Sequence, residues 1–514
     1  MKTVNALACI ALLVFAWLTL RHVHESVFLE DQVDQLQNFE ALLRLKPYAL
    51  LGPAMSGTQP TAHALGPVGA IVIGLPVALG LGIDGSHAVM SLILSAATAF
   101  TFVVLLRIDR PFAWLWFSIF CASGLVWWNA GLFWVTTLLL PAGLVLMGIA
   151  ASCLWRPSLL KIVLLALLAV FAMHVHPAAV VAAPVVAIAG ARAALRLRSG
   201  EALRHRSRQA ARQLSPRAKL AIVLLAIAAF GPYLLAEGLT GFQNSRAMLA
   251  HVRQTASDQP LAIDAGRETL LIATDPTQVL TGAGFSTVVV LAIGGALAAS
   301  ALLALWRRGR RTVPSHAGEQ DATGVLLWLT VIAIVVMVGQ AVFFALMRRP
   351  LGGYHYVTLP APFYAVVPAA FLRELLARPL ERRAAPIVLA CACLAFLVWS
   401  GPARADRSMA PAMWSYRNIV SAIDQLCGGG AADTFEGDGF AAVVNPSHDG
   451  VLQYLMKRRF ADCRYEKGSS LLIAASRDGH YEDSFVIGGR RYRRDTVRFP
   501  GIALYRDVSG QRGP

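Results

Sequence analysis

The sequence predicts a polytopic α-helical membrane protein followed by a small α/β domain, and three observations lead to this fold class. The 514 residues are 56% hydrophobic and only 15% charged, whereas soluble proteins carry about 25% charged residues. Uncharged apolar runs recur along the first 400 residues and are long enough for helices that cross a bilayer. Beyond residue 400, 29 of the remaining 114 residues are charged, as in a soluble domain.

The apolar runs predict about eleven transmembrane helices. The first run follows Lys2 and ends in Arg21 and His22 rather than at a signal-peptidase site, so we interpret it as a retained signal anchor. A further run, residues 65–82, contains five glycines and two prolines. This composition does not suit a straight spanning helix, and we expect an interfacial or re-entrant helix in the first outer loop. The predicted spans are residues 4–20, 88–106, 112–128, 131–154, 162–173, 177–190, 220–235, 286–305, 324–346, 357–372 and 385–399.

The distribution of Lys and Arg predicts the orientation. With residues 65–82 outside the bilayer and the N-terminus in the cytoplasm, the short inner loops hold 22 basic residues and the outer loops hold 8. A spanning run with the same N-terminus would invert the count to 6 inside and 24 outside, against the positive-inside rule. A spanning run with an outer N-terminus satisfies the rule, but it requires the Gly/Pro-rich run to cross the bilayer. We therefore expect a cytoplasmic N-terminus and a periplasmic C-terminal domain.

This topology also explains the formal net charge of +16. The basic excess lies in the cytoplasmic loops, and the outer loops and C-terminal domain together sum to zero. A nucleic-acid partner, which would need a clustered basic domain, is therefore not expected.

Two domains follow, residues 1–400 in the membrane and residues 401–514 outside it. In the second we expect helices at 413–426 and 451–459 and strands at 441–444, 471–475 and 502–506. Its two cysteines, Cys427 and Cys463, suggest one disulfide in an oxidising compartment.

Carboxylates gather in the first outer loop, in the string ESVFLEDQVDQLQNF. Glu30, Asp31 and Asp34 lie close behind the first span, where they could supply a general base for an acceptor hydroxyl or bind a divalent metal. The alternative interpretation is a solvated juxtamembrane helix.

The same loop continues as LLGPAMSGTQPTAHALGPVGAIVIGLPVALG, with His63 between two Gly-Pro turns. Three more motifs follow: the Trp-Trp-Asn of residues 127–129, the His-Val-His-Pro turn of residues 174–177, and RRPLGGYHYVTLP at residues 348–360. Together these motifs resemble the GT-C membrane glycosyltransferases, of the protein O-mannosyltransferase and aminoarabinose transferase type (family 39-like). The resemblance covers roughly residues 1–400.

The resemblance implies transfer of a hexosyl or pentosyl group from a polyprenyl-phosphate carrier to an acceptor hydroxyl, usually with inversion. Asp31 or the neighbouring Glu30 would act as the base, although Asp34 stays open as an alternative. Arg348 and Arg349 would stabilise the departing phosphate, with lipid-headgroup anchoring as the alternative. The other expected substrate contacts are Asp34, His63, Asn129, His176, Tyr354 and His355, although interfacial histidines are more often structural.

No cofactor is certain from the sequence, and a divalent metal is conceivable. The expected partners are the polyprenyl-phosphate sugar and a lipid, glycan or protein acceptor, at the bacterial inner membrane. A flippase for lipid-linked saccharides and a non-catalytic scaffold are the alternatives, and the uncharged spans argue against the flippase.

Overall fold

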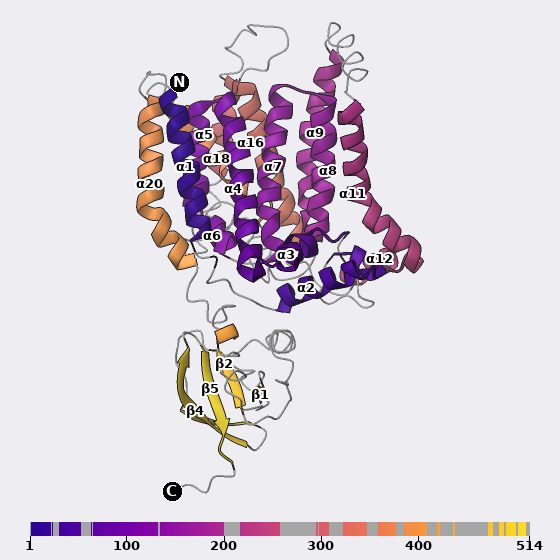
Figure 1. Cartoon of the computed structure of the whole chain (residues 1–514). Helices are drawn as coiled ribbons and strands as arrows, with labels where there is room; N and C mark the ends of the chain where they lie inside the picture. Colours follow the sequence, from indigo (N-terminus) through magenta and orange to yellow (C-terminus); the bar gives the residue numbers. More distant parts are fainter. Residues whose placement is uncertain are drawn as a thin grey trace.

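The computed structural model consists of a helical bundle and a β-sheet beyond one end of it (Figure 1). The described residues are 2–21, 23, 30–52, 63, 65–131, 134–199, 216–257, 295–296, 298–307, 322–346, 358–376, 385–408, 419–421, 435–436, 471–475, 483–487, 490–499 and 502–509.

Six helices within these ranges are long and apolar enough to cross a membrane. Shorter apolar helices occupy other predicted spans, including α8 (Leu159–Val175), residues 298–307 and part of α20 (Ala385–Ser408). A mostly helical multi-pass membrane protein is thus confirmed, while the total of eleven spans stays a prediction. The six long segments are α1 (Lys2–Leu20), α4 (Gly82–Ile108), η3 with α7 (Val135–Leu138, Leu139–Trp155), η4 with α9 (Pro177–Ala182, Ala183–Ser199), α11 (Pro216–Thr240) and α16 (Ala322–Leu346).

Short helices gather at one end of the bundle, which we call the α2 end (Figure 1). They are α2 (Glu30–Leu43), α3 (Val68–Ala78), α6 (Gly124–Gly131) and α12 (Gln243–Ser257). The N-terminus lies at the opposite end, and the sheet lies beyond the α2 end.

Helix α3 is too short to cross the bilayer, as the Gly/Pro-rich sequence predicts. Its 11 residues span about 16 Å at 1.5 Å per residue, roughly half of a hydrocarbon core. Gly80 and Gly82 follow it with φ of +83° and +68°, a region that glycine enters without steric cost. This turn lets the chain leave α3 at the α2 end and start α4.

Two predicted spans are each broken into two helices. Residues 112–128 form α5 (Arg110–Ala122) and α6, because the carbonyl of Cys121 accepts the indole N–H of Trp127 at 2.7 Å and the chain turns at Ser123. Residues 357–372 form α17 (Ala361–Tyr364) and α18 (Val366–Leu375). Pro368 lies four residues after Tyr364, where its ring excludes an unbroken helix.

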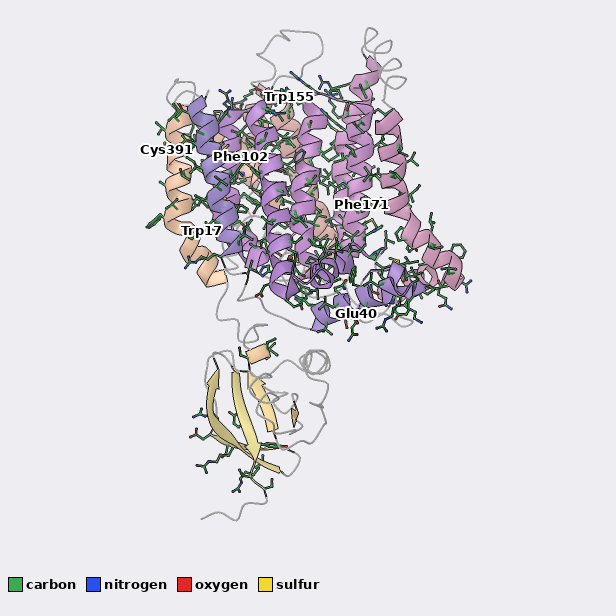
Figure 2. All side chains as sticks on the ribbon, in the orientation of Figure 1. Trp17, Glu40, Phe102, Trp155, Phe171 and Cys391 are labelled. Atoms are coloured by element: carbon green, nitrogen blue, oxygen red, sulfur yellow. The ribbon has the colours of Figure 1, made fainter. Side chains whose placement is uncertain are left out.

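The bundle encloses one hydrophobic core in which aromatic rings of α1, α4 and α5 pack together. Phe15 of α1 contacts Phe117 and Trp127, with ring centroids 6.2 and 5.5 Å apart. Phe102 of α4 lies 4.7 Å from Phe117 and 5.0 Å from Trp114. Such pairs stabilise packing by about 1 kcal/mol each beyond the burial of area. The labelled Phe102 lies within the bundle in Figure 2, and Trp17 marks the α1 surface.

The sheet has the strand order β1-β2-β5-β4-β3, with β1 parallel to β2 and the other pairs antiparallel. Its strands are β1 (Phe435–Glu436), β2 (Leu471–Ala475), β3 (Ser484–Ile487), β4 (Arg490–Phe499) and β5 (Ile502–Asp507). Strands β2 and β5 were predicted. The predicted strand 441–444 and helix 451–459 lie outside the described residues, as does most of helix 413–426. Helix α20 continues past residue 400 to Ser408, and the two-domain division stays a prediction.

Candidate functional site

The acidic residues of the first loop open helix α2. Glu30 and Asp31 are in its first turn, where the partial positive charge of a helix N-terminus favours carboxylates. Asp34 follows one turn later with an exposed side chain, and partial desolvation by the surrounding protein raises its pKa above the ordinary value. The opposite face of α2 buries Val33 and Leu36. Helix α2 thus begins with Glu30 and Asp31 and presents the Asp34 side chain at the end of the bundle.

Helix α12 holds the backbone of His63. Its backbone N–H donates to Oδ1 of Asn244 at 2.6 Å, and its carbonyl accepts from Nδ2 of Asn244 at 3.2 Å. The Asn244 side chain, in the first turn of α12, is buried. His63 Nδ1 also lies 3.2 Å from the carbonyl oxygen of Gly52. One amide side chain therefore fixes both backbone groups of a predicted substrate contact.

Asn129 borders a small pocket between α4, α6 and α7. Its Nδ2 donates to the Leu125 carbonyl at 2.7 Å, while its buried Oδ1 has no hydrogen-bond partner among the described residues. Ser91, Thr137 and His87 also line the pocket, which has room for about one water molecule. An unsatisfied buried acceptor costs about 1–3 kcal/mol, so this oxygen is available to a polar group that enters.

His87 lies between two acceptors. Its Nδ1 is 3.3 Å from the carbonyl oxygen of Val23 and its Nε2 is 3.3 Å from that of Ala130. A neutral imidazole donates one hydrogen bond, whereas the imidazolium donates two. The tautomer therefore decides which of the two carbonyls the neutral ring serves. His87 joins the end of α1 to α6 beside the Asn129 pocket.

The start of α3 passes close to α2, η3 and α8, and two glycines allow it. A Cβ on Gly66 would lie 2.2 Å from Nδ1 of His174, and a Cβ on Gly69 would lie 2.1 Å from Cγ2 of Val135 and 3.4 Å from Oε1 of Gln35. Within the described ranges, three buried polar atoms near this crossing lack hydrogen-bond partners: Gln35 Oε1, His174 Nδ1 and Thr136 Oγ1. We call these three atoms, together with Asn129 Oδ1, the open polar layer.

The two histidines of the HVHP turn have different environments. His174 is fully buried, and its Nε2 lies 2.6 Å from the carbonyl oxygen of Ala229. His176 is half-buried and caps η4, with Nδ1 accepting from the N–H of Ala178 at 3.1 Å. Its role as a substrate contact stays a prediction.

Residues 358–364 are held firmly in the bundle. The Thr358 hydroxyl donates to the Thr136 carbonyl at 3.5 Å, and the Trp116 indole donates to the Pro362 carbonyl at 2.9 Å. The Tyr364 hydroxyl bonds to Gln340. Gly143 of α7 admits the Leu359 carbonyl, because a Cβ there would lie 1.9 Å from that oxygen. In the sequence, this anchored segment begins with the last three residues of the motif at 348–360, which also contains Arg348 and His355.

The structure thus places Glu30, Asp31, Asp34, His63, Asn129 and His176 on segments that meet at the α2 end. Arg348, Arg349, Tyr354 and His355 lie outside the described residues, as do Cys427 and Cys463. Sequence analysis missed Asn244, Gln35, Thr136 and His87. None of these four residues belongs to a recognisable sequence motif. Each is identified only by the residues that surround it in the fold. Among the described residues, no group of three or more His, Cys, Asp or Glu side chains could hold a metal ion.

The arrangement defines a multi-pass helical membrane protein that buries polar side chains beneath short helices at one end. No family model matches the sequence. No curated protein matches it either. Among solved structures, the chain is similar to the crystal structure of ArnT from Cupriavidus metallidurans bound to undecaprenyl phosphate. The TM-score is 0.55, the alignment covers 99% of each chain, and 11% of the residues are identical. The resemblance expected from the sequence is confirmed at the level of the fold.

Proposed function

We propose that the protein is a membrane glycosyltransferase that moves a sugar from a polyprenyl-phosphate carrier to an acceptor hydroxyl. The observation that carries the proposal is the open polar layer at the α2 end, to which Gln35 of the acidic helix α2 contributes. The fold adds support, because ArnT was crystallised with undecaprenyl phosphate.

The proposal assigns a chemical role to each of the charged side chains predicted for the site. Asp31, with Glu30 beside it, accepts the proton of the attacking hydroxyl, because a carboxylate at this place can act as a general base. An acceptor oxygen then attacks the anomeric carbon as the bond to the phosphate oxygen breaks, which inverts the configuration. Arg348 and Arg349 take up the negative charge that develops on the departing polyprenyl phosphate.

The open polar layer would bind the sugar. Asn129 Oδ1 and Gln35 Oε1 are acceptors for sugar hydroxyls, and both are buried without partners in the described part of the chain. A hydroxyl that satisfies such an atom removes its desolvation penalty, so it contributes to selection of the sugar. His63, Asp34 and His176 would complete the contacts.

The same proposal places the α2 end on the outer side of the bacterial inner membrane. The N-terminus lies at the opposite end of the bundle (Figure 1), and the positive-inside count assigns that end to the cytoplasm. The sheet beyond the α2 end would then be periplasmic.

Purified full-length protein, a panel of radiolabelled undecaprenyl-phosphate sugars and a cell-envelope extract as the acceptor pool provide the test. We expect label transfer from one donor, and Asp31→Asn should lower it by about 100-fold or more while the melting temperature is unchanged. Transport of intact donor across vesicles without transfer would favour a flippase. Equal transfer by wild type and Asp31→Asn would contradict the assignment of the base.

A further inference from the structure

One face of the β-sheet is basic. In β4, Arg491 and Arg493 are exposed, and Tyr492 between them is 2% exposed. Side chains alternate between the two faces of a strand, so the arginines share the face opposite to the buried tyrosine. The register pairs Arg493 with Arg506 of β5, which places a third arginine on the same face. We call this surface the arginine face.

These three positions lie close together because neighbouring strands are closely spaced. Adjacent strands lie about 5 Å apart, and residues two apart in a strand are separated by about 7 Å. Like charges directly opposite one another destabilise a sheet. Arg491 and Arg493, two positions apart on one face, repel each other in the same way, and an anion that binds between them offsets this repulsion.

Acidic residues close to these strands lie on the other face. Asp483 binds Arg494 at 2.7 Å, and Asp507 pairs with Tyr492 in the register. Within the described residues, no acidic side chain makes an ion pair with Arg491 or Arg493. The described ion pair thus lies on the face of Tyr492, and within the described residues Arg491 and Arg493 keep their charge.

The arginine face also offers contacts that are not ionic. Ser484 of β3 pairs with Arg493, and Val486 pairs with Arg491. Both are exposed, Val486 to 62%. A hydroxyl and an apolar side chain beside arginines suit a sugar ring with a carboxylate, because the ring presents hydroxyls and an apolar C–H face. The open surface fits an extended chain, in which several weak contacts combine.

We propose that the arginine face is a binding surface for an acidic polysaccharide, a polymer of sugars that carry carboxylates. Its position beyond the α2 end of the bundle (Figure 1) favours a polymer over the headgroups of the membrane that holds the helices. The proposal does not depend on the glycosyltransferase activity.

The test measures binding of fluorescent polygalacturonate to the full-length protein in neutral phosphatidylcholine nanodiscs, with neutral dextran as a ligand control. We expect Arg491→Gln with Arg493→Gln to weaken binding by about tenfold and added salt to weaken it further. Arg494→Gln is the matched control, because it changes the same residue type in the same strand on the opposite face. Its affinity should stay within about twofold of wild type.

Three results would overturn the proposal. They are no binding of polygalacturonate, an equal loss in the Arg494→Gln control, and tighter arginine-dependent binding of phosphatidylglycerol vesicles or of polyglutamate. The first result would show that the protein has no such binding site. The second would show that binding does not depend on the arginine face. The third would identify a lipid or an acidic protein as the partner. Arg491 and Arg493 are exposed and Arg494 is half-buried, so unchanged thermal unfolding of each variant verifies that folding is intact.

Discussion

The polar side chains at the two ends of the helical bundle differ in how fully they are hydrogen-bonded. At the end opposite to α2, Asp109 accepts from Nε and Nη2 of Arg373 at 3.0 and 2.8 Å and from the N–H of Phe112 at 2.9 Å. Lys161 and Arg196 donate to carbonyls near the C-terminus of α7, where cations are favoured. At the α2 end, the four atoms of the open polar layer have no partners among the described residues, and toward the opposite end the same holds only for Trp114 Nε1 and Arg192 Nε in the described part of the chain.

This difference distinguishes side chains with a structural role from those with a role in the proposed function. Saturated polar groups such as Asp109 connect helices and contribute to stability. Buried polar groups without a protein partner lower stability unless a water molecule or a ligand satisfies them. The comparison therefore predicts that substitutions at the opposite end lower the melting temperature, whereas those at the α2 end lower turnover.

The largest expected loss of stability is that of Arg373→Gln. It leaves the Asp109 carboxylate, whose side chain is 5% exposed, without its cation, at a cost of about 3 kcal/mol. Adding Asp109→Asn should restore part of the loss, because the remaining charge is removed. Thermal unfolding in detergent measures both, and turnover per folded molecule should stay near wild type. A more stable single variant would contradict the pairing.

Gly143→Ala tests how residues 358–364 are anchored. The new Cβ would meet the Leu359 carbonyl oxygen at 1.9 Å, so backbone must move, at a cost of about 2 kcal/mol. Gly148→Ala in the same helix is the control, because its Cβ would meet side-chain atoms rather than backbone, the ring edge of Phe100 at 2.7 Å and the Thr101 hydroxyl at 3.1 Å. We expect Gly143→Ala to lower both stability and donor affinity, and Gly148→Ala to change both less. Equal effects would show that the close approach is unimportant.

Asn244→Ala tests whether α12 positions His63. The variant removes both hydrogen bonds to the His63 backbone, each of which contributes about 1 kcal/mol, and transfer should fall by about tenfold. Asn38→Ala, which removes one bond to the Leu51 carbonyl, should have a smaller effect. In a His63→Ala background, Asn244→Ala should lower the transfer rate by a smaller factor. An undiminished loss in the double variant would rule out action through His63.

The smallest expected effect is that of Asp34→Asn on pH-dependent stability. The raised pKa of Asp34 means that the folded protein favours the protonated carboxyl, so its contribution is lost as the pH rises through that pKa. Asp34→Asn should therefore melt slightly higher than wild type at pH 7 and equally at about pH 3, where the carboxyl is protonated in both states. A lower melting temperature at pH 7 would contradict this assignment.

The sequence predicted the features that depend on composition along the chain. The Gly/Pro-rich run and its neighbouring charges predicted a non-spanning α3, and the apolar runs located the long helices. Breaks at Ser123 and Ala365 were missed because they arise from the Trp127 indole and from Pro368, inside runs that are uniformly apolar. Strand β4 was missed because arginines occupy both faces around Tyr492, so the sequence shows no alternation of polar and apolar residues.

The candidate site was only partly predictable. Carboxylates and histidines stand out as residue types, so Asp31 and His63 could be chosen from the sequence. The partner of His63 is 181 positions away, and the contact of Gly66 with His174 joins two distant segments. Such pairings depend on how the helices pack, and local patterns carry no information about them.

The most direct test of the central claim compares two Asp→Asn variants at opposite ends, Asp31→Asn and Asp109→Asn, in the donor-transfer assay and in thermal unfolding. We predict that Asp31→Asn loses about 100-fold or more in turnover per folded molecule and keeps its melting temperature. Asp109→Asn should show the reverse, a lower melting temperature with turnover within about threefold of wild type. Equal turnover of the two variants per folded molecule would contradict the assignment of catalysis to the α2 end.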